Sequence, residues 1–452
     1  MTKLSLLTDQ LHAAAPQTEL LTSSGDLKRF AVDGVKPQVV ALPGVVDDVA
    51  ALLKIASERH LAVLPVGGCT ELELGQPPER YDLAICTVRL NALLEHEAAD
   101  LTCSVQAGMP LAALQQYLTA KGQFLALDPP NAERATIGGI LAANASGPQR
   151  LRYGAARDLV IGLRVALGDG TIARSGGKVV KNVAGYDLNK LYIGSLGTLG
   201  IIVEANFKLI PRPERQETLL VSFENAPAAM ETVIALLSSV VTPTAIELLD
   251  PAAQRHLSEQ AIKMLPAGAL ALWEGPAHLL AISFSGGAQA VARQLADTRT
   301  TATRHAGSPG DHLEDAAHDA FWAAVRAQQI GPVVCKVSLL INELAPFLAH
   351  AQTICQEQQL EASAIAHAGS GVIYLQLRPP DATDRLAVVI SQLRAQALKS
   401  KGSLVITHAP TALKAQINVW GEARPDLRLM ETLKQKFDPH HTLVKGRFVG
   451  GL

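Results

Sequence analysis

The hydrophobic and polar positions of the chain follow strand and helix periods in turn. Val39–Leu42 is a short apolar run with β-branched residues, and apolar residues then recur at helical spacing from Val45 to Ala56. A second apolar run, Leu61–Val66, follows directly, so this segment is predicted to fold as strand, helix and strand. Further elements in this half are predicted at Asp82–Thr87, Leu101–Gln106, Pro110–Lys121, Gly162–Leu167, Thr171–Arg174 and Ile201–Ile210. The turn sequence Gly-Asp-Gly at 168–170 predicts that two of these strands form a hairpin.

From Gln216 onward the pattern changes to strands and helices that alternate in two similar runs. This alternation predicts loosely repeated βαβ-type units whose helices pack on one face of a sheet. The stretch Thr300–Glu314 has the weakest pattern and is predicted to be the least structured. The predicted elements are Thr218–Phe223, Pro227–Ser238, Ala245–Leu249, Leu279–Phe284 and Ala288–Thr298 in the first run, and Val333–Leu340, Leu344–Gln358, Ser363–His367, Val372–Leu377, Asp384–Leu398 and Leu404–Thr407 in the second.

These changes of pattern predict two domains and a tail. Residues 1–215 are expected to form the first domain and residues 216–408 the second. Residues 409–452 hold one predicted helix, Leu427–Phe437, and a glycine-rich end, and they are expected to return to the first domain. A chain of 452 residues is long enough to bury two such cores.

Composition and charge narrow the functional classes. With 48% apolar and only 18% charged residues, the chain is too apolar to be disordered. A formal net charge of −2 argues against nucleic acid as the main partner, because phosphate binding needs clustered Lys and Arg. The low share of charged residues also indicates that a partner covers part of the surface.

Neither a membrane-spanning segment nor a secretion signal is expected. The most apolar long stretch, Val233–Leu249, is interrupted by Ser, Thr, Pro and Glu residues, and polar side chains interrupt the first 25 residues. A cytoplasmic location is therefore expected, with peripheral membrane association through partners left open. The five cysteines lie at least 17 residues apart, whereas zinc and iron–sulfur sites need clustered thiolates, so neither site is expected.

Three segments of small residues in the first half leave the backbone open to close approach. Gly67–Thr70 follows a predicted strand, so its consecutive N–H groups suit a phosphate or a pyrophosphate, with an ordinary turn as the alternative. Residues 136–147 predict a short helix start with outward-facing N–H groups and then a flat turn, and Gly194–Gly200 precedes a strand. Together the segments favour an extended ligand with a diphosphate and flat rings. The glycine patterns of Rossmann and P-loop proteins are absent from the sequence.

These segments also carry a resemblance to a known family. The chain resembles FAD-binding flavoproteins of the vanillyl-alcohol oxidase and p-cresol methylhydroxylase type in the strings at residues 65–70, 136–139, 180–188, 194–202 and 437–448. Within that family it is most similar to the FAD-binding E-type subunit of bacterial glycolate oxidase. The resemblance is strong over residues 37–215 and the last 20 and weak between them. It implies an α+β fold, with a two-part FAD-binding domain and an α+β cap domain built on an antiparallel sheet.

The resemblance implies a bound, non-covalent FAD. Relatives with covalent FAD attach it to a His or a Cys, but the first loop has no His, and Cys69 is expected only to allow close approach. The first loop would wrap the pyrophosphate, the second segment would line the flavin and the ribityl chain, and the third would lie at the adenine end. The implied binding residues are Val66, Gly67, Gly68, Cys69, Thr70, Pro129, Thr136, Ile137, Gly138, Gly139, Ala143, Asn144, Ser146, Gly147, Gly200 and Ile202.

The cap string of related enzymes is altered in this chain. Related 2-hydroxy-acid dehydrogenases and the D-type subunit carry His-Ala-Gly-Asp-Gly-Asn-x-His, whose two histidines hold a metal or the substrate hydroxyl. Here the string begins with His367, but Ser370 replaces the acid and Tyr374 replaces the second histidine. Of a later Glu-His pair only His408 remains. Too few ligands are left for a metal, so none is expected.

Four side chains are candidates for a part in the oxidation itself. His367 is either a flavin-side proton acceptor or a satisfied turn histidine, and Tyr374 is the other candidate for taking the hydroxyl proton. Arg326 stands where related proteins place an arginine for the substrate carboxylate, with a surface or interface role as the alternative. Lys336 has the same two interpretations. Two further residues, which either border the flavin or pack locally, are Lys181 and Tyr186.

The resemblance implies a complex that oxidises a small 2-hydroxy acid, glycolate to glyoxylate. The altered cap string favours a FAD-binding subunit with two partners: a D-type flavoprotein subunit, where the chemistry would lie, and an iron–sulfur subunit, which would take the electrons. One alternative is a self-sufficient FAD-dependent 2-hydroxy-acid dehydrogenase. The other is a scaffold subunit without chemistry of its own, and the intact glycine segments count against it.

Overall fold

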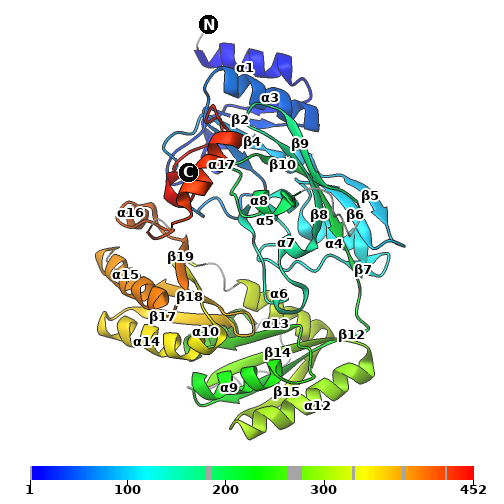
Figure 1. The fold of residues 1–452 in the computed structure, drawn as a ribbon, viewed down its shortest axis with the longest axis vertical. Coiled ribbons are helices and arrows are strands. Elements are labelled where there is room, and N and C mark those ends of the chain that lie inside the picture. The colour runs from blue at the N-terminus through cyan, green and yellow to red at the C-terminus, as the bar shows by residue number, and fades with distance from the viewer. Residues whose placement is uncertain (1–2, 179–185, 262–276, 328–330, 379–382, 423–424) are drawn as a thin grey trace. The chain divides into compact units, whose positions relative to one another are not determined.

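The computed structural model describes residues 3–178, 186–261, 277–327, 331–378, 383–422 and 425–452 and divides into two compact units (Figure 1). The first unit comprises Met1–Ser146, Ala155–Arg212 and Glu422–Leu452, and the second comprises Gly147–Gly154 and Pro213–Gly421. The chain returns to the first unit later than residue 409, where the tail was expected to begin. Residues 409–421 stay with the second unit because α16 (Thr411–Lys414) contacts α15 (Thr383–Lys399) and the Ile406 amide donates to the Val419 carbonyl at 2.9 Å.

A small, mostly parallel sheet begins the first unit. Its strand order is β1 (Glu19–Leu21), β2 (Val39–Leu42), β4 (Leu83–Cys86) and β3 (Val63–Val66), with β1 antiparallel to β2. Helix α3 (Val46–Glu58) links β2 to β3 and buries Val49, Leu52 and Leu53 completely. The predicted strand, helix and strand are therefore confirmed. The other elements here are α1 (Lys3–Ala14), which packs on α3, α2 (Ser24–Arg29) and η1 (Thr87–Arg89).

A five-stranded antiparallel sheet forms the rest of the first unit. Its order is β5 (Leu93–Glu97), β6 (Thr102–Gln106), β10 (Ile201–Lys208), β8 (Val160–Ala166) and β9 (Ile172–Gly176). The predicted hairpin joins β8 to β9, and Gly170 takes a positive φ of +89° in its turn, a conformation that favours glycine. The remaining elements are α4 (Leu111–Thr119), β7 (Gln123–Phe124), α5 (Ile137–Ala143), α7 (Ala156–Leu159), α8 (Asn189–Tyr192), β11 (Ile210–Pro211), α17 (Leu427–Phe437) and η3 (Val449–Gly451).

The second unit is built on one eight-stranded antiparallel sheet made of two repeats with the same topology. Along the sheet the order is β15-β12-β14-β13-β17-β18-β16-β19. Each repeat is a β-α-β-β-α-β unit, and in each the second strand, β13 or β17, lies at the junction. The first repeat is β12 (Arg215–Phe223), α9 (Ala226–Leu237), β13 (Ala245–Leu249), β14 (His278–Gly286), α12 (Ala288–Arg304) and β15 (Ser308–Glu314). The second is β16 (Val334–Ser338), α14 (Leu344–Glu357), β17 (Glu361–His367), β18 (Val372–Arg378), α15 and β19 (Ser403–His408).

Helices cover both faces of this sheet, so the prediction of a single helical face is wrong. One face packs against α9, α12, α14 and α15. Helices α10 (Pro251–Ala261) and α13 (Asp315–Ala327) cover part of the other. Strand β12 shows why: Leu219 and Val221 join the first core, whereas Leu220 between them joins the second. A strand that is apolar on both faces needs cover on both. Two short elements, α6 (Arg150–Tyr153) and η2 (Ile341–Glu343), complete the unit.

The stretch Thr300–Glu314, predicted to be the least structured, is regular. Helix α12 continues to Arg304, and β15 follows at the edge of the sheet (Figure 1). The apolar pattern is weak because an edge strand exposes most of its side chains, and among the residues of β15 Leu313 alone is buried. Backbone pairing with β12 therefore determines this strand more than burial does.

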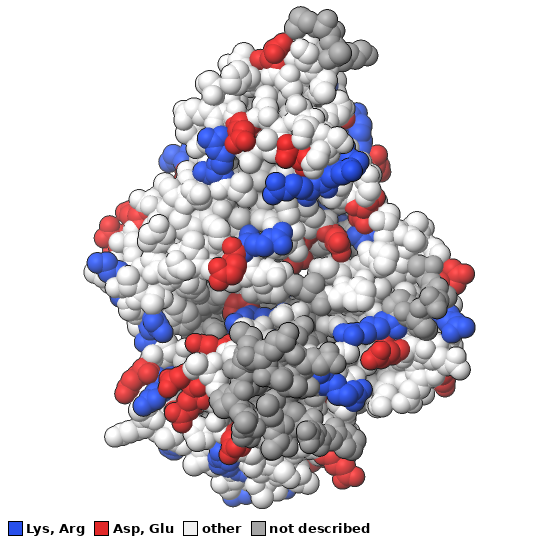
Figure 2. Space-filling model, turned by 180° about the vertical axis from the view of Figure 1, so that it is seen from behind, with Lys and Arg blue, Asp and Glu red and all other residues white. Residues whose placement is uncertain are grey.

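Charged side chains of both signs are interspersed over the described surface seen in Figure 2. This mixture matches the formal net charge of −2. Among the helices of the described residues, none combines the length and the hydropathy that crossing a membrane requires.

A buried ion pair holds the C-terminal helix α17 in the first unit. The Lys434 ammonium donates to Asp438 Oδ2 at 2.6 Å and to the Thr198 carbonyl at 2.8 Å, and both side chains are almost completely buried. Asp438 accepts in turn from the amides of Thr442 and Leu443 at 2.8 and 2.9 Å. Because all these partners replace water, the pair fixes the chain end against the third small-residue segment.

Removal of the Lys434 charge is expected to destabilise the protein strongly. Lys434→Met leaves the Asp438 carboxylate buried without its cation, which costs about 3–5 kcal/mol of unfolding free energy. Urea unfolding measures the loss. The exposed Lys436→Met on the same helix is the control and should change stability by less than about 0.5 kcal/mol. Equal effects of the two substitutions would contradict this role for the pair.

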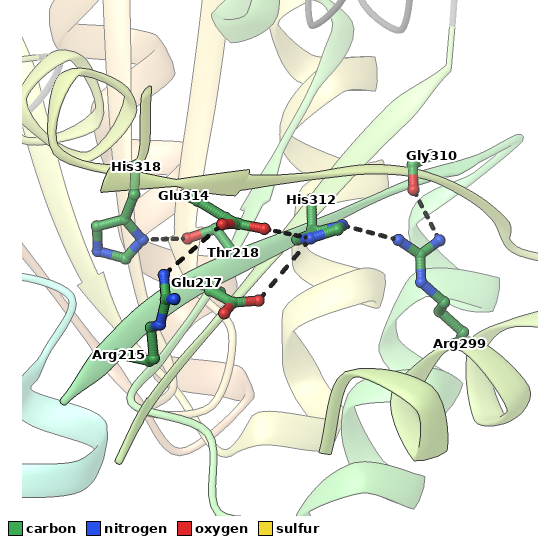
Figure 3. Close-up of polar contacts among 8 residues, drawn as sticks. All are labelled: Arg215, Glu217, Thr218, Arg299, Gly310, His312, Glu314 and His318. Carbon is green, nitrogen blue, oxygen red and sulfur yellow. Dashed lines mark hydrogen bonds and ion pairs between the residues drawn. The ribbon is translucent and has the colours of Figure 1, made fainter. Parts of the chain in front are cut away.

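A buried histidine links α13 to β12. The Trp322 indole donates to Thr218 Oγ1 at 2.8 Å, and the Thr218 hydroxyl lies 2.9 Å from His318 Nδ1 (Figure 3 shows His318 and Thr218). Burial lowers the pKa of His318 to about 4, so the ring is neutral at pH 7. The neutral ring can accept the Thr218 proton at Nδ1.

His318 should make stability depend on acid. The unfolded histidine binds a proton near pH 6.5 and the folded one only near pH 4, so this contribution to stability is lost as pH falls through that range. Between pH 7.5 and 5 the wild type should lose about 2 kcal/mol more unfolding free energy than His318→Gln. The exposed His350→Gln serves as control. Parallel pH profiles for wild type and His318→Gln would contradict the assignment.

Candidate functional site

The three small-residue segments lie together in the first unit. A Cβ at Gly67 would overlap the Thr136 hydroxyl, and a Cβ at Gly197 would lie 2.7 Å from the Pro65 ring. The amide of Leu196 donates to the Ala142 carbonyl at 2.9 Å, which joins the second segment to the third. Several of these glycines are therefore required because chain segments pack closely against each other.

The first loop has the backbone geometry of an anion site. Within the part of the chain that the structure describes, the amides of Gly67, Gly68, Cys69 and Thr70 donate no hydrogen bond. Cys69 takes a positive φ of +58°, and such turns point successive N–H groups to one side. Four consecutive donors without partners among the described residues are compatible with a pyrophosphate, and the binding itself stays a prediction.

The start of the second segment differs from its prediction. The amides of Ile137 and Gly138 do not face outward, because they donate to the carbonyls of Met109 and Ala107 at 2.9 and 2.7 Å. The Gly139 amide donates to Thr136 Oγ1 at 3.3 Å, which caps α5. The prediction of outward-facing N–H groups is therefore wrong, since the segment docks against the chain that follows β6.

The end of α5 offers a polar group instead. Asn144 ends the helix in the left-handed conformation, with φ +49°, and its Oδ1 is buried without a hydrogen-bond partner among the described residues. A buried amide oxygen of this kind fits a polar group of a cofactor. The other predicted binding residues stay predictions; Val66 ends β3, Ile202 lies on β10, Pro129 is buried, and Gly147 falls in the second unit.

In the second unit, His367 is paired with an acid that the sequence analysis missed. His367 Nδ1 lies 2.6 Å from Glu247 Oε1, and both side chains are completely buried. The two residues are direct partners across the β13–β17 ladder. Burial raises the pKa of Glu247 well above its usual value. A lone Glu within the apolar strand Ala245–Leu249 is the signal that would have found it.

The other cap candidates gather beside this pair. The Tyr374 ring meets the His367 ring edge-on at 5.2 Å between centroids. Lys336 lies opposite Tyr374 in the β16–β18 ladder, with its Nζ 5.8 Å from the centre of the Tyr374 ring. The structure therefore brings His367, Tyr374 and Lys336 to one face of the sheet, with Glu247 at its centre.

Three candidates are not placed beside His367. Arg326 lies half-buried in the last turn of α13, the helix that carries His318. Tyr186 is almost fully exposed, and Lys181 lies outside the described residues. Their predicted roles stay predictions.

A cluster at the sheet edge has the composition of a metal site but the hydrogen bonds of an ion-pair network (Figure 3). His312 Nε2 lies 2.7 Å from Glu314 and 3.9 Å from Glu217, which faces Glu314 across the ladder. The Arg299 guanidinium, itself bonded to the Gly310 carbonyl, lies 3.5 Å from His312 Nδ1. Because a guanidinium only donates, Nδ1 accepts and Nε2 carries the proton that a metal would displace. His312 thus offsets the repulsion between two facing carboxylates.

Two family models match this chain. The FAD binding domain matches residues 37–176, and the C-terminal domain of FAD linked oxidases matches residues 212–447. Glycolate oxidase subunit GlcD of Bacillus subtilis strain 168 is 30% identical, over 91% of this chain and 88% of its own. D-2-hydroxyglutarate dehydrogenase of Xanthomonas citri pv. viticola is 30% identical, over 97% and 95%. D-lactate dehydrogenase of Anaerostipes hadrus is 27% identical, over 91% and 89%.

Solved structures share the fold. p-Cresol methylhydroxylase superposes with a TM-score of 0.74 at 16% identity, covering 99% of this chain and 97% of that one. Alkyldihydroxyacetonephosphate synthase gives a TM-score of 0.75 at 19% identity, covering 98% and 84%. The expected α+β fold, a two-part FAD-binding domain with an antiparallel cap sheet, is confirmed by this likeness and by the family models.

Bound FAD is expected to dissociate when the protein is denatured, because no covalent bond should hold it. Burial raises the pKa of the Cys69 thiol, which disfavours the nucleophilic thiolate, and the thiol lies 3.7 Å from the Gly67 carbonyl. After the protein is precipitated by heat, all of its flavin should be found in the supernatant. The flavin absorbance of the supernatant measures this release. Cys69→Ala should carry the same flavin content as the wild type. Flavin retained by the wild-type pellet and lost from the Cys69→Ala pellet would contradict this.

Proposed function

This chain belongs to the family of FAD-linked oxidases and is an FAD-dependent oxidoreductase, and on that basis we propose that it oxidises a small 2-hydroxy acid as the FAD-binding subunit of a glycolate oxidase-type complex. The Glu247–His367 pair carries this proposal, because it places a histidine with a fixed partner on the cap sheet. The altered cap string by itself favours oxidation of the substrate on a D-type partner. The Glu247–His367 pair favours oxidation on this chain instead.

The first unit would hold FAD through its own backbone. The four donors of Gly67–Thr70 would bind the pyrophosphate, and Asn144 would offer its buried Oδ1 to a polar group of the cofactor. Bound FAD supplies the two-electron acceptor for oxidation of an alcohol carbon. Binding would be non-covalent, because the raised pKa of the Cys69 thiol disfavours the thiolate that a covalent bond to this loop would need.

His367 would act as the proton acceptor. Its Nδ1 faces Glu247, so Nε2 is the ring nitrogen that would take the hydroxyl proton of a 2-hydroxy acid. Lys336, whose Nζ lies 5.8 Å from the centre of the Tyr374 ring, is one candidate for binding the substrate carboxylate, and Arg326 on α13 is the second. Tyr374 would border the substrate through its ring contact with His367.

The partners would be a D-type flavoprotein subunit and an iron–sulfur subunit in the cytoplasm. One relative is named as a subunit of glycolate oxidase, which supports a complex. The scattered cysteines of this chain supply no clustered thiolates, so electrons would leave through a partner that holds such a cluster. In the alternative, this chain has no activity of its own because Tyr374 replaces the second histidine of the cap string. It would then be the FAD-binding partner of a catalytic D-type subunit.

Anaerobic reduction of the purified chain tests the proposal. Glycolate should bleach the flavin absorbance, and D-lactate should serve as the comparison substrate. His367→Gln keeps a hydrogen-bonding side chain but loses the base, so its reduction rate should fall about 10²–10⁴-fold with flavin content unchanged. His350→Gln, exposed on α14, is the control and should react at the wild-type rate.

The same experiment separates the alternatives when it is repeated with D-type and iron–sulfur subunits co-expressed. Bleaching in the complex but not in the chain alone, with no effect of His367→Gln, would place the chemistry on the partner. A chain that purifies without flavin under all conditions would contradict the cofactor role altogether.

A further inference from the structure

A cavity of about 360 Å³ lies on the five-stranded sheet of the first unit. Residues from all five strands line it, from Glu95 on β5 to Arg174 on β9, together with Gly177 and Lys178 directly after β9. Figure 1 shows these strands. A volume of this size is within the range of sites that bind small ligands.

The register of the strands gathers polar side chains on one face of this sheet. Glu204 on β10 is paired with Arg164 on β8, and Arg164 is paired with Arg174 on β9. In the neighbouring row, Asn206 on β10 is paired with Ser104 on β6. Glu204 and Asn206 are two positions apart on the same strand, so both rows lie on the same face and form a polar floor.

The chain after β9 adds a wall to this floor. Asn206 Nδ2 donates to the Gly177 carbonyl at 3.0 Å, which fixes the segment on β10. The Lys178 ammonium then pairs with Glu95 on β5, the strand at the opposite edge of the sheet. Gly162 leaves room for the segment, because a Cβ there would lie 2.6 Å from the Gly177 carbonyl oxygen. The segment thus encloses part of the sheet face.

The cavity has an excess of positive charge. Arg164 Nη1 donates to Glu204 Oε1 at 2.6 Å, and Lys178 is matched in the same way by Glu95. The Arg174 side chain forms no ion pair or hydrogen bond with the residues that the structure describes. It faces Arg164 directly across the β8–β9 ladder. Two facing arginines repel each other, so an anion bound between them would be stabilised.

The floor of the cavity is more buried than the solvent face of an ordinary sheet. Ser104 is only 7% exposed and the Glu204 side chain 16%. The Ser104 hydroxyl lines the cavity and has no hydrogen-bond partner within the described ranges, and Arg164 Nε is buried without a partner there. Buried polar groups are normally hydrogen-bonded, so donors of this kind beside a cavity indicate a ligand with acceptor oxygens.

The cavity and the third small-residue segment lie on opposite faces of the sheet. Val165 follows Arg164 on β8, and successive side chains of a strand point to opposite faces. Gly200 of the third segment packs against Val165, since a Cβ at Gly200 would lie 2.5 Å from Val165 Cγ1. A ligand in the cavity therefore does not compete for the position predicted for FAD.

We propose that this cavity binds a small molecule through a carboxylate or phosphate group. The guanidinium groups of Arg164 and Arg174 hold the oxygens of that group, and the Ser104 hydroxyl donates a further hydrogen bond. Carboxylate and phosphate share the oxygen geometry that a guanidinium binds with two parallel hydrogen bonds. The site goes beyond the proposed function, because it uses neither FAD nor the residues of the second unit.

Calorimetric titration of the full-length protein with FAD present tests the site. Inorganic phosphate and succinate are titrated separately, and the tighter binder identifies the oxyanion. At least one of them should bind with a dissociation constant of about 1 mM or less. Arg174→Gln should weaken this binding about tenfold or more, because it removes the guanidinium without a partner. Arg59→Gln, at an exposed position directly after α3, removes the same charge elsewhere and should leave the affinity unchanged.

Glu95→Gln provides a test with the opposite sign. It removes a negative charge from the cavity, so the same anion should bind about threefold more tightly. With ¹⁵N-labelled arginine, the Nε signals of Arg164 and Arg174 are assigned by their loss in Arg164→Lys and Arg174→Gln, and both should shift on titration. No binding of either anion at about 10 mM, equal affinities of wild type and Arg174→Gln, or binding that shifts neither signal would overturn the inference.

Discussion

The pairing of β13 with β17 is the contact on which the second unit depends. Each strand is the outer strand of its own βαββαβ repeat, so without this ladder two four-stranded sheets would each expose an edge. The ladder also determines which side chains meet. Its register places Glu247 opposite His367, so their contact does not depend on the conformation of loops. The contact between Glu247 and His367 thus depends on the same backbone hydrogen bonds that join the two repeats.

The first unit depends on close approach of backbone to backbone. Gly67 fits against Thr136, and Gly197 fits against Pro65, so the small residues are used first for the packing of the protein itself. The donors left over, in Gly67–Thr70, are then grouped on one loop. Glycine-rich segments therefore differ in a way that a sequence does not show: some glycines make room for the chain, and others leave amides without a partner among the described residues.

The sequence predicted the parts of the fold that follow from burial. Strands such as Val39–Leu42 and helix Val46–Glu58 have strong apolar periods, and the match between expectation and structure is close there. β15 was missed because an edge strand relies on backbone pairing and shows little apolar alternation. The covering of both sheet faces also escaped prediction, since periodicity shows that a strand is buried without showing which helix buries it.

The candidate site was predictable only where a motif named its residues. The first loop and His367 were found in this way, whereas Glu247 lies 120 positions from its partner and belongs to no motif. The predicted outward orientation of the α5 amides was wrong. These amides donate to carbonyls of the chain after β6, which is distant in sequence. The Glu247–His367 contact depends on strand register, and the direction of the α5 amides depends on hydrogen bonds to a distant segment. The local spacing of residues in the sequence predicts neither.

The return of the C-terminal segment has a consequence for the order in which the protein is made. The outer strand β3, which leads into the Gly67–Thr70 loop, is flanked by residues 442–444: the Val63 amide donates to the Thr442 carbonyl, and the Val444 amide donates to the Val63 carbonyl. These residues leave the ribosome only after the whole second unit has been synthesised. A nascent chain therefore carries an open strand edge beside the Gly67–Thr70 loop until translation is nearly finished, and this edge of the small sheet closes only when residues 442–444 have been made.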